Sequence, residues 1–153
     1  MLIYSTQLGD IEVSDDKIIS FPYGLPGFPD EKNFAFLPYQ VDSPFAYLQS
    51  VVEPQLTFLV VDPFAFFKDY EFEMNDHMAQ EIELAASNLP RIVNIVSIPA
   101  KTEEMTTNLL APLVINTQNN KAVQIILEKT AYTTRHRLFS AGMPQSPSEG
   151  EPL

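Results

Sequence analysis

The sequence predicts a domain of the all-β class, mainly antiparallel, with one short helix. Thirteen prolines are spread along the chain, and because proline interrupts helix interiors, their spacing leaves room for few helices. The runs between them are rich in Phe, Tyr, Val and Ile, which suit the pleated surface of a strand. Short apolar runs separated by turn residues are typical of a β-sandwich or a β-barrel.

The first two predicted strands, at residues 2–6 and 11–13, form a hairpin around the turn Leu8-Gly9-Asp10. The strands that follow are expected at residues 17–21, 34–37, 46–51, 57–61, 71–74 and 92–98. The last of these is almost continuously apolar, which favours a central strand. A second hairpin is predicted from residues 113–116 and 122–127, because a polar run separates them.

One helix is predicted, over residues 76–87. Asp76 can accept hydrogen bonds from the free N–H groups of the first turn. Met78 and Ile82 recur at the spacing that places side chains on one helical face. Pro90 ends the pattern, since proline cannot continue a helix.

The length of 153 residues suits a single domain, which we expect over residues 1–140. Hydrophobic residues make up 45% of the chain, so it can bury a core. Residues 141–153 are rich in Pro, Ser, Gly and Glu. We expect a disordered tail there, because so little apolar surface cannot offset the entropy cost of ordering.

The chain is strongly acidic, with 20 Asp plus Glu against nine Lys plus Arg and a formal net charge of -11. Such a charge repels nucleic acid, whose phosphates must be met by Lys and Arg. Direct binding of RNA or DNA is therefore not expected, and a basic protein is the better partner. Solubility alone is the competing explanation for the charge, because many proteins are acidic only for that reason.

The sequence also limits the compartment and the chemistry. It has no cysteine, which excludes disulfides, thiolate metal sites and thiol catalysis. The N-terminus has neither the basic region nor the long apolar run of a signal peptide. No stretch approaches the roughly 18 successive apolar residues of a membrane span. We therefore expect a cytoplasmic protein without membrane contact.

The most informative stretch is residues 62–74, which holds five aromatic residues and four carboxylates around one lysine. From residue 69 to residue 74, acids and large apolar residues alternate strictly. The acids are Asp69, Glu71 and Glu73, and the apolar residues are Tyr70, Phe72 and Met74. In a strand, successive side chains point to opposite faces. The pattern predicts one acidic face, either simply solvated or presented to a basic partner.

The sequence offers no catalytic or cofactor-binding set. The acidic row lacks the glycine turn of a calcium loop, so no metal site is predicted. His77 and His136 have no acid or nucleophile at motif spacing. The glycines near residues 24–28 are not followed by the Lys and Ser or Thr of a phosphate-binding loop. We expect a protein that is not an enzyme and that holds no cofactor.

Several phrases, taken together and in this order, resemble the FliW family of flagellar assembly factors over nearly all of residues 1–139. They are Gly24-Leu25-Pro26-Gly27-Phe28, Ser43-Pro44-Phe45, Leu48-Gln49-Ser50, Asp62-Pro63-Phe64, Asp69-Tyr70-Glu71-Phe72, and the run from Asn108 through Leu109-Leu110-Ala111-Pro112 to Asn116. Each phrase alone is common, but the ordered set is specific.

The resemblance implies a non-enzymatic bacterial regulator with a small β-barrel-like fold. Such proteins bind CsrA, an RNA-binding repressor of flagellin translation, and relieve that repression. They also bind flagellin in the cytoplasm before its export. The two partners alternate, so that free flagellin sequesters the regulator and restores repression.

Partner contacts are predicted on the acidic stretch and on two asparagines of the last phrase. The candidates are Asp62, Phe64, Phe67, Asp69, Tyr70, Glu71, Glu73, Asn108 and Asn116. Core packing is the competing role for the aromatic residues, and an ordinary turn role is the competing one for each asparagine. The alternative functions are a small-molecule-binding β-barrel or enzyme, with its ligand in the barrel mouth, and a scaffold of the flagellar apparatus.

Overall fold

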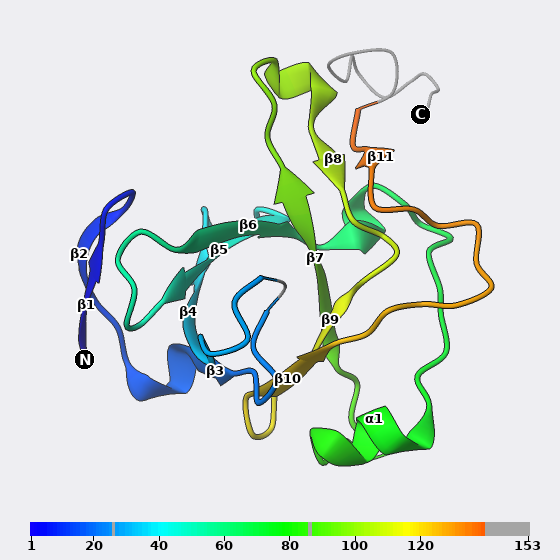
Figure 1. The fold of residues 1–153 in the computed structure, drawn as a ribbon, viewed down its shortest axis with the longest axis horizontal. Coiled ribbons are helices and arrows are strands. Elements are labelled where there is room, and N and C mark those ends of the chain that lie inside the picture. Colours follow the sequence, from blue (N-terminus) through cyan, green and yellow to red (C-terminus); the bar gives the residue numbers. More distant parts are fainter. Residues whose placement is uncertain (26, 86, 140–153) are drawn as a thin grey trace.

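Within the described part of the chain, seven strands close into a barrel (Figure 1). The computed structural model describes residues 1–139 other than 26 and 86, and the tail predicted over 141–153 lies outside them. The barrel strands are β3 (Ile18–Ser20), β4 (Asn33–Pro38), β5 (Phe45–Ser50), β6 (Thr57–Val61), β7 (Arg91–Ser97), β9 (Leu113–Asn116) and β10 (Lys121–Gln124).

Neighbouring barrel strands are mostly antiparallel. From β3 to β7 each strand pairs with the next one in the sequence. Strand β9 then pairs with both β7 and β10, and a parallel contact between Lys121 and Ser20 closes the ring. The mainly antiparallel all-β class is confirmed, and the barrel is the form it takes. Strands β3 to β7 and β9 begin and end within one residue of their predicted bounds.

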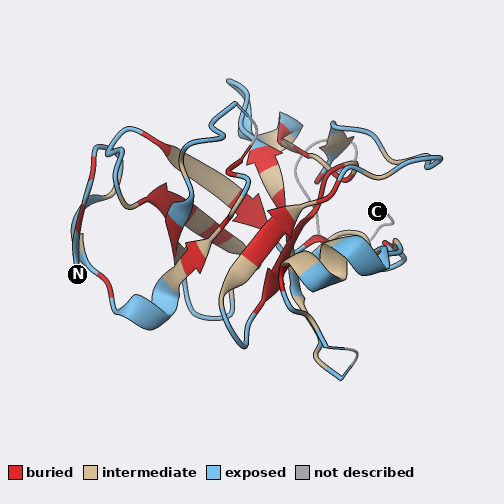
Figure 2. Ribbon diagram, turned by 60° about the horizontal axis from the view of Figure 1, so that its bottom comes forward, coloured by how far each residue is buried: buried red, intermediate tan, exposed pale blue. Residues whose placement is uncertain are grey.

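The barrel interior is filled by side chains that alternate along the strands, and Figure 2 shows the buried residues as red segments of the strand ribbons between tan ones. Phe21 and Phe34 are fully buried and meet edge to face, with ring centroids 5.8 Å apart. Leu48, Val60 and Leu113 are also completely buried in this cluster. Close packing of large side chains makes this a core rather than a channel.

The predicted N-terminal hairpin is confirmed as β1 (Leu2–Ser5) and β2 (Gly9–Glu12), a separate two-stranded sheet. Its turn lies at residues 6–8 and not at 8–10 as predicted, because Gly9 and Asp10 already pair with Ser5 and Tyr4. It packs on the barrel through Ile3, which is 1% exposed and lies in a cluster with Ala35 of β4. A polar contact reinforces the junction, since Ser5 Oγ donates to Gln49 Oε1 at 2.7 Å.

Two short strands and three 3-10 turns were not predicted. Strand β8 (Thr106–Thr107) pairs with β7, and β11 (His136–Arg137) pairs with β8, so they extend the sheet beyond the barrel (Figure 1). Two residues are too few to show a period in the sequence. The turns are η1 (Asp15–Lys17), η2 (Pro63–Ala65) and η3 (Thr102–Glu104).

The strand predicted over residues 71–74 is wrong. These residues run along the outside of the barrel without regular structure, and their backbone groups pair with no strand among the described residues. Strand β10 is also shorter than predicted, ending at Gln124 instead of residue 127. Its continuation lies beside Pro112, which accepts from Ile125 N but has no N–H to return the bond.

The helix is confirmed in type but is shorter than predicted. Helix α1 (Asp76–Glu81) is capped by Asn75, whose Oδ1 accepts from Met78 N at 2.8 Å, and not by Asp76 as predicted. It stops because Ile82 turns into the core and is fully buried, while Glu83 adopts a left-handed φ of 57°. Within the described residues, no helix is long and apolar enough to cross a bilayer.

Candidate partner-binding surface

The predicted site lies on one continuous connection, residues 62–75, which links β6 to α1 and is called here the acidic segment. It starts with the turn η2, where Asp62 is the N-cap and Pro63 is the first residue. The Asp62 carboxylate accepts from Phe64 N at 3.0 Å. The Phe64 ring, 43% exposed, is therefore held at the surface by a local cap.

The predicted alternation of faces is confirmed although the segment is no strand. Tyr70 is buried, and Phe72 and Met74 are half-buried against the cluster that contains Ile82 and Ile125. The three acids that alternate with them, Asp69, Glu71 and Glu73, are all exposed. An extended chain alternates its side chains whether or not its backbone is paired. The apolar side chains thus hold the row of carboxylates facing solvent.

Tyr70 anchors the middle of the acidic segment. Its hydroxyl donates to Leu109 O at 2.7 Å and accepts from Asn94 Nδ2 at 3.2 Å. Its ring meets Tyr132 edge to face, with centroids 4.8 Å apart. Burial raises the pKa of the Tyr70 hydroxyl to about 12, because the phenolate would lose its hydration. The segment is therefore fixed to the barrel by a side chain and not by a strand ladder.

Phe67 packs inward, at the start of the same segment. It lies against the cluster that contains Val61 and Leu138, and its ring centroid is 6.0 Å from that of His136. His136 Nε2 accepts from Thr133 N at 2.8 Å, which requires an unprotonated nitrogen. Burial lowers the pKa of His136, which favours that neutral form. Phe67 thus packs beneath the exposed residues of the acidic segment.

The two asparagines among the candidates act within the fold. Asn108 Oδ1 accepts from Leu110 N and Ala111 N, both at 3.1 Å, and shapes the turn before β9. Asn116 is 1% exposed, and its Nδ2 donates to Ile82 O at 2.9 Å and Glu83 O at 3.1 Å. Asn116 therefore closes the C-terminal end of α1, and its buried side chain presents no surface to a partner.

The sequence interpretation missed Asn94 and Tyr132, which support the acidic segment. Asn94 is fully buried, and besides Tyr70 its Nδ2 reaches Asn108 O at 2.8 Å. The Tyr132 hydroxyl accepts from Glu71 N at 3.3 Å. Asn94 did carry a signal, since an amide inside the apolar run 92–98 needs buried partners. Tyr132 carried none, because its contact spans a long sequence separation.

A niche of about 540 Å³ opens beside the acidic segment, where residues 71–75 meet residues 125–130. Ile125 and Leu127 supply apolar lining, and Ile126 is 62% exposed. Glu71, Glu73 and Glu128 place carboxylates around it, against the single cation Lys129 in this lining. Within the described residues, no three His, Cys, Asp or Glu side chains are grouped to hold a metal ion. The arrangement is suited to contact with a basic protein surface.

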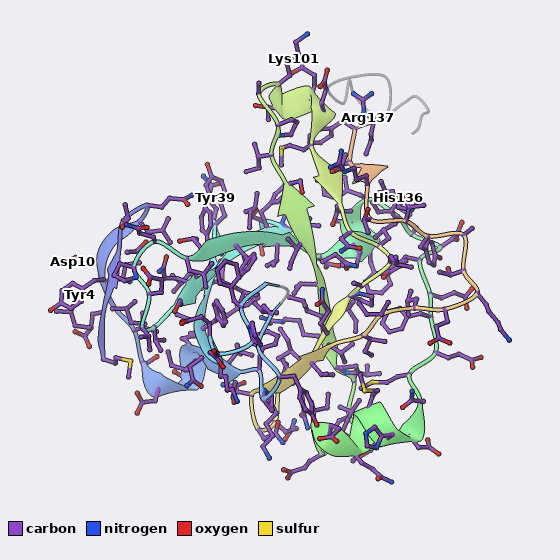
Figure 3. All side chains as sticks on the ribbon, in the orientation of Figure 1. Tyr4, Asp10, Tyr39, Lys101, His136 and Arg137 are labelled. Atoms are coloured by element: carbon purple, nitrogen blue, oxygen red, sulfur yellow. The ribbon has the colours of Figure 1, made fainter. Side chains whose placement is uncertain are left out.

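The acidic segment faces away from the N-terminal hairpin. Tyr4 and Asp10 mark that hairpin on one side of the molecule, and His136 lies near the segment on the other side (Figure 3). Lys101 and Arg137 point outward together at a third place, where the arm of β7 and β8 meets β11 (Figure 3). The arm mixes these cations with Glu103 and Glu104 of η3, whereas four of the five charged side chains on the acidic segment are carboxylates.

Comparisons with known proteins agree on one family. A family model described as FliW protein matches residues 2–138. The chain is 47% identical over 150 residues to the flagellar assembly factor FliW of Desulfitobacterium hafniense strain DSM 10664 / DCB-2, covering 98% of this chain and 99% of that protein. It is 39% identical over 136 residues to the flagellar assembly factor FliW of Bacillus subtilis strain 168, covering 89% and 95%. A crystal structure of the flagellar assembly factor FliW superposes with a TM-score of 0.83 at 36% identity, covering 91% of this chain and 97% of that one.

Proposed function

This chain belongs to the FliW family of flagellar assembly factors, and we propose that it works by binding proteins in the cytoplasm and not by catalysis. One partner is CsrA, the RNA-binding repressor, which the protein antagonises so that flagellin translation resumes. The other partner is flagellin itself, which competes in a partner switch. The observation that carries the proposal is the row of exposed carboxylates held on the acidic segment by buried side chains.

The charge of this surface supports antagonism of an RNA-binding protein. A repressor that binds RNA must carry a basic surface, which the exposed Asp69, Glu71 and Glu73 complement. Once docked, these carboxylates oppose the phosphates of RNA without filling the RNA site. Two unit charges 4 Å apart interact by about 1 kcal/mol in water, so three acids together matter where one does not. The effect weakens with salt, because the screening length is about 10 Å at 0.1 M.

Flagellin binding draws on the apolar part of the same region. Phe64 is 43% exposed and stands at the beginning of the acidic segment, 6.0 Å from the ring of Tyr70. An exposed aromatic ring beside carboxylates suits an amphipathic helix. Because both surfaces lie on one short connection, the two partners would exclude each other.

The test compares two variants with the same change of net charge. The first neutralises the acidic segment by Asp69→Asn, Glu71→Gln and Glu73→Gln. The matched control neutralises three exposed acids whose side chains make no hydrogen bond among the described residues: Asp10→Asn, Asp30→Asn and Glu104→Gln. Asp10 lies on the far hairpin, across the molecule from the acidic segment (Figure 3).

We expect the first variant to bind CsrA about tenfold more weakly at low salt, at roughly 0.5 kcal/mol for each exposed pair. The control should lose much less. Calorimetric titration with CsrA and with monomeric flagellin measures both affinities and their mutual exclusion. Equal affinity of the two variants for CsrA at low salt would remove the acidic segment from the proposal. Heat from neither partner would remove the partner switch.

A further inference from the structure

A second groove, of about 910 Å³, lies at the end of the barrel where β6 and β7 separate. It is lined by Phe36 and Phe45 from β4 and β5, by Phe64, and by Arg91 to Val93 of β7. Its volume is in the range of sites that hold ligands or peptide segments.

The groove exists because the ladder between β6 and β7 stops early. These strands pair only at Val60 with Ile95 and at Val61 with Asn94. The next residue, Asp62, gives its N–H to Pro44 O on the opposite side, at 2.8 Å. Pro63 has no N–H to donate and starts the turn η2. The chain therefore leaves the sheet two residues after Val61.

This departure leaves one edge of β7 open. Arg91, Ile92 and Val93 pair with β9 on one side. On the other side, no backbone group of the described residues bonds to them. Backbone groups alternate between the two sides of a strand, and because Asn94 bonds toward β6, Ile92 is the residue of these three whose N–H and C=O face the open side. An unpaired N–H and C=O at a sheet edge can accept another strand. Pro90, directly before Arg91, has no N–H, so the open edge is short and centred on Ile92.

The surroundings of the open edge are apolar with a distinct charge pattern. Val41 is 91% exposed and Leu89 is 88% exposed, and both line the groove. Asp42 and Asp62 add exposed carboxylates to it. The Arg91 guanidinium is stacked over the Phe36 ring, 4.7 Å from its centroid. The cation is thus held against an aromatic face, while the two carboxylates face solvent.

We propose that this groove is a docking slot for an extended segment of another protein, which adds a strand to β7 at Arg91–Val93. The segment alternates apolar side chains, which enter the groove, with basic side chains, which reach Asp42 and Asp62. Backbone bonds to an open edge supply affinity in this mode of recognition, and the side chains supply specificity. A second copy of this chain is disfavoured, because each copy carries a net charge of -11. The slot is separate from the row of acids at residues 69–73, but it shares Phe64 with the surface proposed for flagellin. Binding of short peptides tests the slot without either proposed partner.

The test uses the full chain labelled with 15N and three synthetic six-residue peptides. The first alternates Val and Lys, the second has Glu in place of Lys, and the third repeats the first with methylated backbone nitrogens. We expect the first peptide to shift the amide signals of Arg91, Ile92 and Val93. The second should bind about tenfold more weakly through repulsion by two carboxylates. The third should not bind, because it cannot complete the strand.

A pair of variants checks the charge. Asp42→Asn should weaken binding of the first peptide about threefold, and Asn tolerates the left-handed backbone of that position, where φ is 65°. Asp30→Asn, which lies outside the groove lining, should leave it unchanged. Shifts that avoid β7, or equal binding of the methylated peptide, would overturn strand addition. Concentration-dependent dimers of the chain with the β7 amides protected would assign the edge to a second copy and overturn the proposal.

Discussion

Replacing Tyr70 with Phe removes a single hydroxyl from the anchor of the acidic segment and keeps the ring. That hydroxyl donates to Leu109 O at 2.7 Å, in a buried position. Asn94 Nδ2 keeps its other acceptor, Asn108 O at 2.8 Å, so one buried group and not two loses its partner. An unpaired buried polar group costs about 1–3 kcal/mol. We expect Tyr70→Phe to lower the free energy of unfolding by about that amount at pH 7.

The same hydroxyl makes the stability depend on alkaline pH. Burial raises the pKa of Tyr70 from 10.0 to about 12. The unfolded chain therefore loses this proton first, so the contribution is complete below pH 10 and is lost as pH rises toward 12. At roughly 1.4 kcal/mol per unit of pKa difference, ionisation of Tyr70 should lower the free energy of unfolding of the wild type by about 2–3 kcal/mol over that window. Tyr70→Phe cannot show this loss.

Urea denaturation followed by circular dichroism measures both effects, at pH 7 and at steps from pH 9 to pH 12. Tyr39→Phe is the control, because Tyr39 is 55% exposed in the connection of β4 to β5 (Figure 3). We expect its free energy of unfolding to follow the wild type throughout. A loss below about 0.5 kcal/mol for Tyr70→Phe at pH 7 would show that the Leu109 carbonyl needs no donor there. A gap between wild type and Tyr70→Phe that does not narrow with rising pH would refute the assigned pKa.

Three further perturbations test other parts of the structure. Gly24→Ala should lower the midpoint of thermal unfolding far more than Gly9→Ala. Both glycines have positive φ, but a Cβ at Gly24 would lie 2.5 Å from Phe28 O, while a Cβ at Gly9 would meet open space. Equal losses for the two variants would contradict the steric reason. Asn116→Ala should cost about 1–3 kcal/mol and expose the amides of α1 to hydrogen exchange, since Glu83 O loses its donor and Ile82 O keeps only the bond from Asn119. Asn119→Ala removes its bond to Ile82 O at 3.2 Å and the acceptor of Lys121 N at 3.0 Å, and should cost less because Asn119 is exposed and water can replace these partners. Burial lowers the pKa of His136, so its ring should titrate below 6.5 by NMR. The free energy of unfolding should fall as pH drops through the folded pKa, because a protonated Nε2 can no longer accept from Thr133 N. A titration midpoint at or above 6.5 would contradict this.

Local pattern was enough to predict which side chains face solvent. The alternation from residue 69 to residue 74 placed the acids outside and the apolar residues inside, as the structure has them. It also predicted most barrel strands closely, because apolar runs bounded by prolines depend only on near neighbours in the chain. The phrases from Gly24 to Asn116 identified the family for the same reason, since they are read directly from residue order.

Pairing could not be read in this way. Residues 71–74 have the alternation of a strand, yet Tyr70 is held by Leu109 and Asn94, which lie 39 and 24 residues away. Helix α1 ends early because Ile82 is buried in the core, where Asn116, 34 residues further on, donates to the carbonyls of Ile82 and Glu83. These contacts decided which of two locally possible conformations was adopted.

The sequence by itself determined the fold class, the family, and the acidic outer face of residues 69–73. Only the tertiary structure decided that this face is carried by an unpaired segment, that Asn108 and Asn116 support the fold from within, and that β7 keeps an open edge. The physical reason is the range of the interactions. The direction of a side chain follows from its own backbone and its neighbours, whereas a hydrogen-bond partner depends on which distant residues the closed barrel brings within about 3 Å.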